Sequence, residues 1–395
     1  MTGLLSLDEA QARVLAAVAA LPPEAVPIEA ASGRVSAEGG SAAVDLPPFP
    51  SSAMDGFAVR SEDAPGTLAV VADVAAGSPA GRALRAGEAM AISTGGVVPD
   101  GADAVVPVED VVQMENSVEI GQVAAGAHVR PRGGDVAAGE EVVGAGILLG
   151  PTQLGALAAA GIAQLMCARR PRVAVLATGS ELVPPGQPLE PGQVYEANAL
   201  MLASALERAG ADVERLPAVA DDEDAHRAAI AHGLEADVLV TSGGVSVGPH
   251  DLVRRVEAEL GVEEVFWRIA VKPGKPVSFG VRGSTLVFGL PGNPVSSLVG
   301  CELLVKPALR ALQGLVDPLP PYETGRLLAP LRRNPSRDEL VRVRARGAAD
   351  GMTLEPLTGQ ESHMIVRAAA ANALVHVQRG EGELAAGDAA RFIRI

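Results

Sequence analysis

Between residues 172 and 314 the same succession of patterns recurs along the chain. A short apolar run is followed by a glycine-containing turn and then by apolar residues at helical spacing. The apolar runs at 173–177, 237–240 and 285–288 are too short for helices and predict buried strands. Helical spacing follows at 198–208, 225–233 and 252–260. This order predicts a three-layer α/β domain over residues 169–315, in which helices cover both faces of a largely parallel sheet.

The segments on either side of this domain have different sequence patterns. Short β-type runs separated by Gly, Pro and Asp turns predict a small β domain inserted at 40–130. Strict alternation at 341–346, followed by a Gly-Ala-Ala-Asp-Gly turn, predicts a hairpin in a C-terminal barrel-like β domain over 316–395.

The N-terminal part predicts helices. Ser6-Leu7-Asp8-Glu9 is a capping box, which predicts a helix that continues to residue 21, and a second helix is expected at 152–161. We expect residues 1–39 and 131–168 to form one discontinuous helical and linker domain, with the second helix packed on the first.

Composition excludes several functional classes. A net charge of −16 argues against nonspecific nucleic-acid binding, which requires a basic face. There is no signal-peptide pattern, and no apolar run reaches the roughly 18 residues of a membrane span, so we expect a cytoplasmic protein. Cys167 and Cys301 lack the spacing of a zinc or redox motif and are expected to be core thiols.

Two glycine-rich loops carry the candidate chemistry. TSGGVSVGPHD at 241–251 and GLPGNPVSS at 289–297 each follow a predicted strand. Glycine lets a ligand approach the backbone, and a helix that starts after such a loop presents free N–H groups to an anion. Because the carboxyl ends of parallel strands share one edge, the loops predict a phosphate- or oxyanion-binding crevice there. For Asn293 and Pro294, a purely structural role as helix N-cap and first helical residue is also open.

Cations are expected near this crevice. Lys272 and Lys275 lie in the proline-braced segment KPGKP, and Arg268 precedes it. A second cationic group is expected from the alternating residues Arg342, Arg344 and Arg346.

Three acidic positions are expected on three loops at the carboxyl edge of the sheet: Glu181, Asp221 and Asp251. For Asp251, and for Asp221 and Asp222, helix capping is an equally good interpretation. Beside a cationic loop, the three carboxylates also suit a Mg²⁺ site whose ion and lysines together bind phosphate.

Seven segments, in this order, resemble the MoeA-type molybdopterin molybdenumtransferases and the similar E domain of gephyrin: SSAMDGFAV, STGGVVPDGADAVV, VRPRGGDV, ATGSEL, VTSGGVSVGPHD, VKPGKPVSFG and FGLPGNPVSS. The resemblance covers essentially the whole chain and implies an elongated four-domain protomer that acts as a homodimer. The implied reaction takes adenylylated molybdopterin and molybdate, releases AMP and leaves molybdenum on the cofactor's dithiolene. The implied protein partners are the adenylyltransferase and the proteins that mature molybdoenzymes.

The loops and the resemblance together define the candidate site, and the roles of Asp55, Thr94, Asp135 and Ser362 are implied by the resemblance alone. The predicted catalytic residues are Asp55, Glu181, Asp221, Asp251, Lys272 and Lys275, with Glu181, Asp221 and Asp251 as Mg²⁺ ligands. The predicted cofactor-binding residues are Thr94, Asp135, Ser242, Gly243, Gly244, Arg268, Pro291, Gly292, Asn293, Pro294 and Ser362. In the family, the facing protomer supplies the loop that matches Asp55. The chain departs from the family pattern at Arg268, where some members have lysine, and at Phe57, where tyrosine is common.

Two alternative functions stay open at this point. A molybdopterin adenylyltransferase has the same α/β core, but the SSAMDG segment and the last domain argue against it. A gephyrin-like scaffold is the other, although only 2% of the residues are aromatic and no partner-binding patch is evident.

Overall fold

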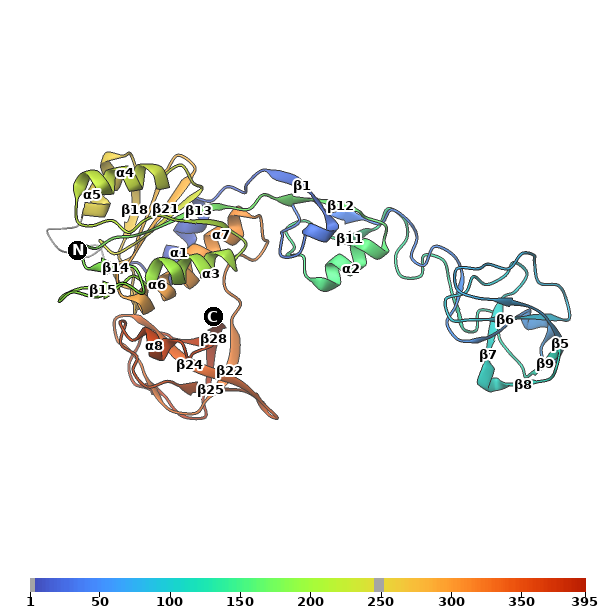
Figure 1. The fold of residues 1–395 in the computed structure, drawn as a ribbon. Helices are drawn as coiled ribbons and strands as arrows, with labels where there is room; N and C mark the ends of the chain where they lie inside the picture. The colour runs from blue at the N-terminus through green and yellow to red at the C-terminus, as the bar shows by residue number, and fades with distance from the viewer. Residues whose placement is uncertain (1–3, 245–251) are drawn as a thin grey trace. The chain divides into compact units, whose positions relative to one another are not determined.

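The computed structural model describes residues 4–244 and 252–395, and the chain divides into two compact units. Unit 1 comprises Met1–Glu24, Gly33–Ala37 and Ala168–Ile395, and unit 2 comprises Ala25–Ser32 and Glu38–Cys167. Figure 1 shows the ribbon of both units, with labels on the helices and on some of the strands. None of the described helices has the length and apolar character needed to cross a lipid bilayer.

Unit 1 is built on a six-stranded sheet. Its order is β16 (Asp212–Arg215), β13 (Arg172–Ala177), β17 (Val238–Ser242), β21 (Thr285–Leu290), β20 (Ser278–Arg282) and β18 (Glu263–Trp267). The first four strands are parallel, β20 is antiparallel to β21, and β18 is antiparallel to β20. The central strands are continuous apolar runs because both of their faces are covered.

Helices cover both faces of this sheet, as predicted. Helices α4 (Glu223–Gly233) and α5 (Leu252–Glu259) pack on one face, where Leu176 and Leu239 point. The other face, with Val175 and Val240, carries α1 (Leu7–Ala16), α3 (Asn198–Glu207) and a long helix. That helix consists of α6 (Pro294–Gly300), a π-helical turn (Cys301–Val305) and α7 (Lys306–Leu312).

The first helix differs from its prediction. The capping box of Ser6 and Glu9 is present, but α1 (Leu7–Ala16) ends before residue 21. The chain then extends, and Leu21 N donates to Leu312 O at the end of α7. Leu7, Ala10 and Val14 are buried in the core of the α/β domain, so the expected packing of α1 on the second helix is wrong.

The C-terminal part of unit 1 is a closed five-stranded barrel with one added strand. The sheet order is β19 (Val271–Lys272), β24 (Asp338–Ala348), β25 (Gly351–Pro356), β22 (Glu323–Leu327), β28 (Ala389–Arg394) and β26 (Ala373–Val377). Pairing of β26 with β24 closes the barrel, and the β24–β25 hairpin is the predicted one. Strand β19 runs parallel to β24, so the start of the KPGKP loop is hydrogen-bonded to the barrel.

Smaller elements complete unit 1. Strand β14 (Leu182–Val183) pairs with β15 (Val194–Tyr195), β23 (Leu331–Arg332) pairs with β27 (Glu383–Leu384), and α8 (Ile365–Ala368) follows the second hairpin strand of the barrel.

Unit 2 contains the predicted small β domain. Its six-stranded sheet has the order β7 (Ala104–Pro107), β4 (Gly56–Val59), β6 (Glu88–Ile92), β5 (Gly66–Val74), β9 (Ser117–Ile120) and β8 (Val111–Gln113). Apolar side chains fill a core on each face of the sheet. Phe57 is buried in one of these cores.

The remainder of unit 2 consists of helix α2 and short strand pairs. Helix α2 is Pro151–Ala159, close to its predicted range. The pairs are β1 (Pro23–Pro27) with β12 (Gln164–Ala168), β2 (Gly40–Ser41) with β11 (Glu141–Val143), and β3 (Ser51–Ser52) with β10 (Val129–Arg130).

Candidate active site

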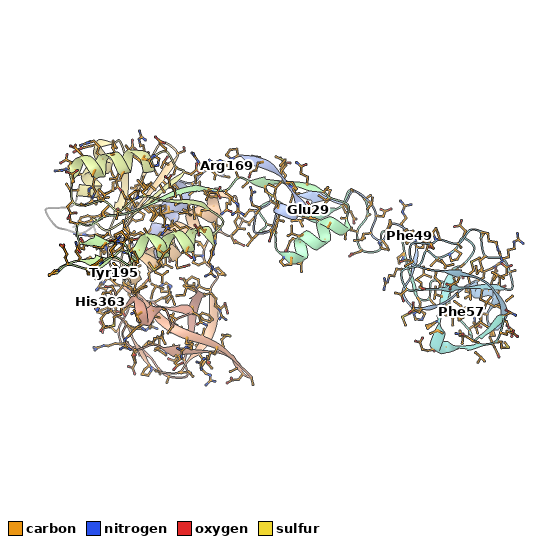
Figure 2. The ribbon with its side chains drawn as sticks, viewed as in Figure 1. Glu29, Phe49, Phe57, Arg169, Tyr195 and His363 are labelled. Carbon is orange, nitrogen blue, oxygen red and sulfur yellow. The ribbon has the colours of Figure 1, made fainter. Side chains whose placement is uncertain are left out.

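A cavity of about 640 Å³ lies at the carboxyl edge of the central sheet in unit 1. Three strands end at this cavity: Thr178 and Glu181 follow β13, Ser242 ends β17, and Gly292 to Pro294 follow β21. Asn198 of α3 and Tyr195 of β15 also line it, together with His363 and Ile365 from the barrel domain. Figure 2 shows Tyr195 and His363 on the same side of unit 1. The cavity therefore lies where the predicted crevice was expected.

The Ser-Gly-Gly turn requires glycine for geometric reasons. Gly243 and Gly244 have φ angles of +102° and +66°, in the region that favours glycine. A Cβ on Gly243 would lie 2.5 Å from Thr178 O, and one on Gly244 would lie 2.4 Å from Val253 Cγ2. The turn is thus packed tightly against the end of β13 and against α5, and its first residue, Ser242, lines the cavity.

Ser242 uses its hydroxyl to hold the second loop. Its Oγ donates to Pro291 O at 3.4 Å and lies 3.3 Å from Ser297 Oγ. Asn198 Nδ2 donates to Ser242 Oγ at 2.9 Å and to Gly292 O at 2.7 Å. Asn198 therefore ties the two predicted loops together. Its role was not predicted from the sequence, although a polar residue that opens a helix at this edge is a usable signal.

Asn293 has a different role from capping. It occupies the N-cap position of α6, but its side chain makes no capping hydrogen bond. Instead Asn293 Nδ2 donates to Ser362 Oγ at 2.9 Å, and Val295 N donates to Ser362 O at 3.0 Å. Thus Ser362, predicted from the last domain, contacts the loop after β21, and it occupies one of the N–H groups expected to face an anion.

The adjacent acidic residues Asp221 and Asp222 have different roles, because only one of them caps a helix. Asp222 is the N-cap of α4 and accepts a hydrogen bond from Ala225 N at 2.8 Å. Asp221 caps nothing: its Oδ2 accepts from Ser180 Oγ at 3.1 Å, and its N–H donates to the same oxygen at 2.9 Å. Ser180 thus joins Asp221 to the loop that carries Glu181.

Glu181 lies folded back over its own turn. A Cβ on Gly179 would lie 2.5 Å from Glu181 Oε2. The third predicted ligand, Asp251, lies outside the described residues. Within residues 4–244 and 252–395, no three His, Cys, Asp or Glu side chains are grouped so that they could hold a metal ion.

The two predicted lysines lie on the loop beside α6. A Cβ on Gly274, between them, would lie 3.5 Å from Ser296 O. Lys272 is half-exposed and donates to Glu339 Oε1 at 3.0 Å, and the two residues are also register partners in the β19–β24 pair. Lys275 is exposed.

The predicted second group of cations is wrong at Arg342, whereas Arg346 is exposed and stays a prediction. Arg342 is only 1% exposed, because the loop at 357–364 covers it. Its guanidinium donates to Gly359 O at 2.7 Å, Glu361 O at 3.2 Å and Met364 O at 3.0 Å, and burial lowers its pKa. Arg344 lies 3.6 Å from the Glu355 carboxylate. Arg342 therefore fixes the loop that bears Ser362 and His363, instead of binding an anion.

Arg268 also has a protein partner. Its guanidinium lies 3.6 Å from the centre of the Trp267 ring, and Arg254 lies 4.1 Å from the same ring. The cation–π contact of Arg268 accounts for its side chain without a cofactor.

In unit 2, Asp55 and Thr94 form a pair. Asp55 Oδ1 accepts from Thr94 N at 2.6 Å and from Thr94 Oγ1 at 2.9 Å. These bonds, the backbone one first, hold the pKa of Asp55 below its usual range. Asp135 is exposed, and its backbone N–H donates to Leu46 O at 2.9 Å.

Comparison with family models accounts for almost the whole chain. Residues 5–161 match the MoeA N-terminal region (domain I and II), and residues 174–311 match a probable molybdopterin binding domain. Residues 324–395 match the MoeA C-terminal region (domain IV).

Similar proteins span the same length. A protein named molybdopterin molybdenumtransferase 2 from Mycobacterium tuberculosis is 40% identical over 97% of both chains. A molybdopterin molybdenumtransferase from Haemophilus influenzae is 34% identical over 98% of this chain and 97% of its own.

Two solved structures share the fold over nearly the full length. Both are molybdopterin biosynthesis MoeA proteins from Pyrococcus horikoshii. One has a TM-score of 0.81 and 33% identity, with 99% of each chain covered. The other has a TM-score of 0.86 and 27% identity, with 99% of this chain and all of its own covered.

Proposed function

We propose a reaction for the cavity from one premise: this chain belongs to the MoeA family of molybdopterin biosynthesis proteins. It is a molybdopterin molybdenumtransferase, which takes molybdate and adenylylated molybdopterin and releases AMP as molybdenum enters the cofactor. The observation that carries this conclusion is the cavity itself. Three strand ends of the molybdopterin-binding domain and the Ser362–His363 loop of the barrel converge on it.

The test is direct. Incubation of the purified chain with adenylylated molybdopterin and molybdate should release AMP and yield a cofactor that activates a cofactor-free molybdoenzyme. The control omits molybdate. The proposal fails if molybdate changes neither AMP release nor the activating yield.

A molybdopterin adenylyltransferase was the alternative enzyme. That class of enzyme needs the molybdopterin-binding domain alone, whereas the family matches here extend over both flanking regions. Incubation with molybdopterin and ATP separates the two activities, because only the adenylyltransferase would form the adenylyl adduct.

The residues around the cavity suit an anionic substrate. The tight Ser-Gly-Gly turn lets a phosphate oxygen approach the backbone at the end of β17. Lys272 and Lys275, on the adjoining loop, are proposed to bind phosphate through charge-assisted hydrogen bonds. Asn198 and Asn293 hold the loops in place, so the donors are already positioned before substrate arrives.

Magnesium dependence is part of the proposal. Mg²⁺ commonly uses one or two protein carboxylates together with substrate phosphates and water, and Glu181 and Asp221 supply such oxygens from two joined loops. We propose Glu181, Asp221 and Asp251 as the residues that hold it. When bound, the ion would neutralise charge on the phosphate oxygens.

The assembly and compartment are also proposals. We propose a homodimer in which Asp55 of one protomer serves the reaction of its partner, as the family resemblance implies. The adenylyltransferase would supply the substrate, and molybdoenzyme-maturation proteins would receive the product. Two buried free cysteines, Cys167 and Cys301, suit a reducing compartment such as the cytoplasm.

A further inference from the structure

Thr178 is a buried residue whose hydroxyl has no hydrogen-bond partner among the residues that the structure describes. It follows β13 directly, is 7% exposed, and lines the cavity. Its Oγ1 makes no hydrogen bond to any residue in the described parts of the chain. The backbone is fixed independently of the hydroxyl, because Thr178 N donates to Ser242 O at 3.0 Å.

An unsatisfied buried hydroxyl is uncommon, since its desolvation is then not compensated. Thr178 Oγ1 faces the two glycines of the Ser-Gly-Gly turn. A Cβ built on Gly243 would lie 2.8 Å from this oxygen, and one on Gly244 would lie 3.3 Å from it. Glycine at both positions leaves room for the hydroxyl, which lies against the backbone of this turn.

Neighbouring polar groups in the cavity are already used. The Ser242 hydroxyl and the Asn198 side-chain nitrogen both make hydrogen bonds within the protein. Thr178 Oγ1 differs from them because it can donate its proton without breaking a protein hydrogen bond.

We infer that Thr178 is a substrate-binding residue whose hydroxyl donates a hydrogen bond to a tetrahedral oxyanion in this cavity. The oxyanion is a phosphate group or molybdate, which offer the same kind of acceptor oxygen. This inference rests on the proposed function for the identity of the anions, and it adds a binding contact that neither the loops nor the lysines provide.

The experiment compares Thr178→Val with Thr178→Ser. Valine has nearly the shape of threonine but lacks the hydroxyl, whereas serine keeps it. A matched control is Thr241→Val, because Thr241 is fully buried in β17, lies outside the cavity lining, and donates from Oγ1 to Phe288 O at 3.4 Å. Calorimetric titrations with AMP and with molybdate, run separately, give the dissociation constants, and thermal unfolding without ligand gives the midpoint.

For Thr178→Val we expect weaker anion binding without a loss of thermal stability. Thr178→Val should leave the ligand-free midpoint unchanged or raise it, because a buried unpaired polar group is removed. It should raise the dissociation constant of at least one anion about tenfold, the usual effect of losing a hydrogen bond to a charged group. Thr178→Ser should keep the wild-type affinity. Thr241→Val should lower the midpoint and leave both affinities unchanged.

Each outcome assigns or removes the contact. Weaker binding of AMP alone assigns the contact to phosphate, and weaker binding of molybdate alone assigns it to the metal oxyanion. Unchanged affinity for both, or no binding of either to the wild-type chain, overturns the inference. If the valine variant does not fold, Thr178→Ala replaces it in the same titrations.

Failure of the proposed function would look different. A wild-type chain that binds AMP or molybdate through Thr178, but does not convert adenylylated molybdopterin, would refute the reaction and leave the binding contact intact.

Discussion

Asn293 Nδ2 donates a hydrogen bond to Ser362 Oγ across 2.9 Å, and this bond joins the molybdopterin-binding domain to the barrel domain beside the cavity. The backbone of Ser362 repeats the connection by accepting from Val295 N. Within unit 1, the wall of the cavity is therefore formed by two domains, and its shape depends on how the 357–364 loop is held.

The first prediction concerns this bond. Asn293→Ala and Ser362→Ala should each reduce turnover, and the double variant should be no worse than the more damaging single one. In urea unfolding, the coupling free energy between the two positions should be about 1 kcal/mol, typical of one hydrogen bond. A control for capping is Asn293→Ser: serine caps helices as well as asparagine does, but it is too short to reach Ser362. Additive effects of the two alanine substitutions would contradict the connection.

A second prediction concerns the lysine loop. Lys272→Ala and Lys275→Ala should each weaken binding of adenylylated molybdopterin by about 1.5–3 kcal/mol, the range for a hydrogen bond to a charged group. Unfolding midpoints in denaturant should change little, because both lysines are exposed and an ion pair made by an exposed lysine contributes about 1 kcal/mol or less.

Glu339→Gln separates ion pairing from substrate binding. It removes the negative partner of Lys272 and leaves the lysine in place, so affinity for the anionic substrate should be retained or improved. Loss of affinity in Glu339→Gln equal to that in Lys272→Ala would mean that the ion pair itself, and not the free ammonium, is needed.

How far the sequence could predict this structure depends on which interaction decides each element. The strands β13, β17 and β21 were predictable because parallel strands covered on both faces are continuous apolar runs. The SGG turn was predictable as a site for close backbone approach. By contrast, alternation at 341–346 showed a strand but not that the 357–364 loop would bury Arg342.

The candidate site shows the same division. From the sequence, helix capping was open for both Asp221 and Asp222. In the structure Asp222 is the cap, whereas Asp221 is hydrogen-bonded to the Ser180 hydroxyl. Asn198 was recognisable only as a polar residue that opens a helix at this edge, and Thr178 carried no comparable signal. Their roles depend on contacts with residues far away in the chain, or on the absence of such contacts.

The third prediction uses this separation of the acidic residues. Glu181→Gln and Asp221→Asn should depress molybdenum insertion most strongly when Mg²⁺ is limiting, since each removes a negative charge from the proposed ion. Asp222→Asn is the matched control: asparagine caps helices as well as aspartate, so stability and turnover should both stay near wild type. Equal turnover of all three variants across a Mg²⁺ titration would refute the metal assignment.

A fourth prediction is a shift in pH dependence in unit 2. The pKa of Asp55 is lowered in the folded chain, so its contribution to stability is present above the ordinary aspartate value of 3.8. That contribution is lost as the pH falls through the lower folded pKa. Thr94→Val removes the hydroxyl bond but keeps the backbone bond, so the pKa of Asp55 should move up toward its ordinary value.

Carbon-detected NMR titration of the Asp55 carboxylate measures this directly. Asp103 is an internal control, because its pKa is lowered by a separate pair of bonds from Ser61 and should not change in Thr94→Val. An unchanged Asp55 titration in the variant would show that the hydroxyl bond has no influence on the carboxylate.

The last prediction tests the proposed homodimer. Asp55→Ala and Glu181→Ala chains should each be inactive alone, because each lacks one residue assigned to the reaction. If the two residues serve one reaction from different chains, mixed dimers rebuild one intact set, and random exchange restores about a quarter of the wild-type sites. Subunit exchange is verified with two affinity tags, and a mixture of Asp55→Ala with Thr94→Ala is the negative control, because this pair lies within one unit of one chain. Verified exchange without recovery of AMP release would place Asp55 and Glu181 in the same chain for catalysis, and the proposal of a shared site would then be wrong.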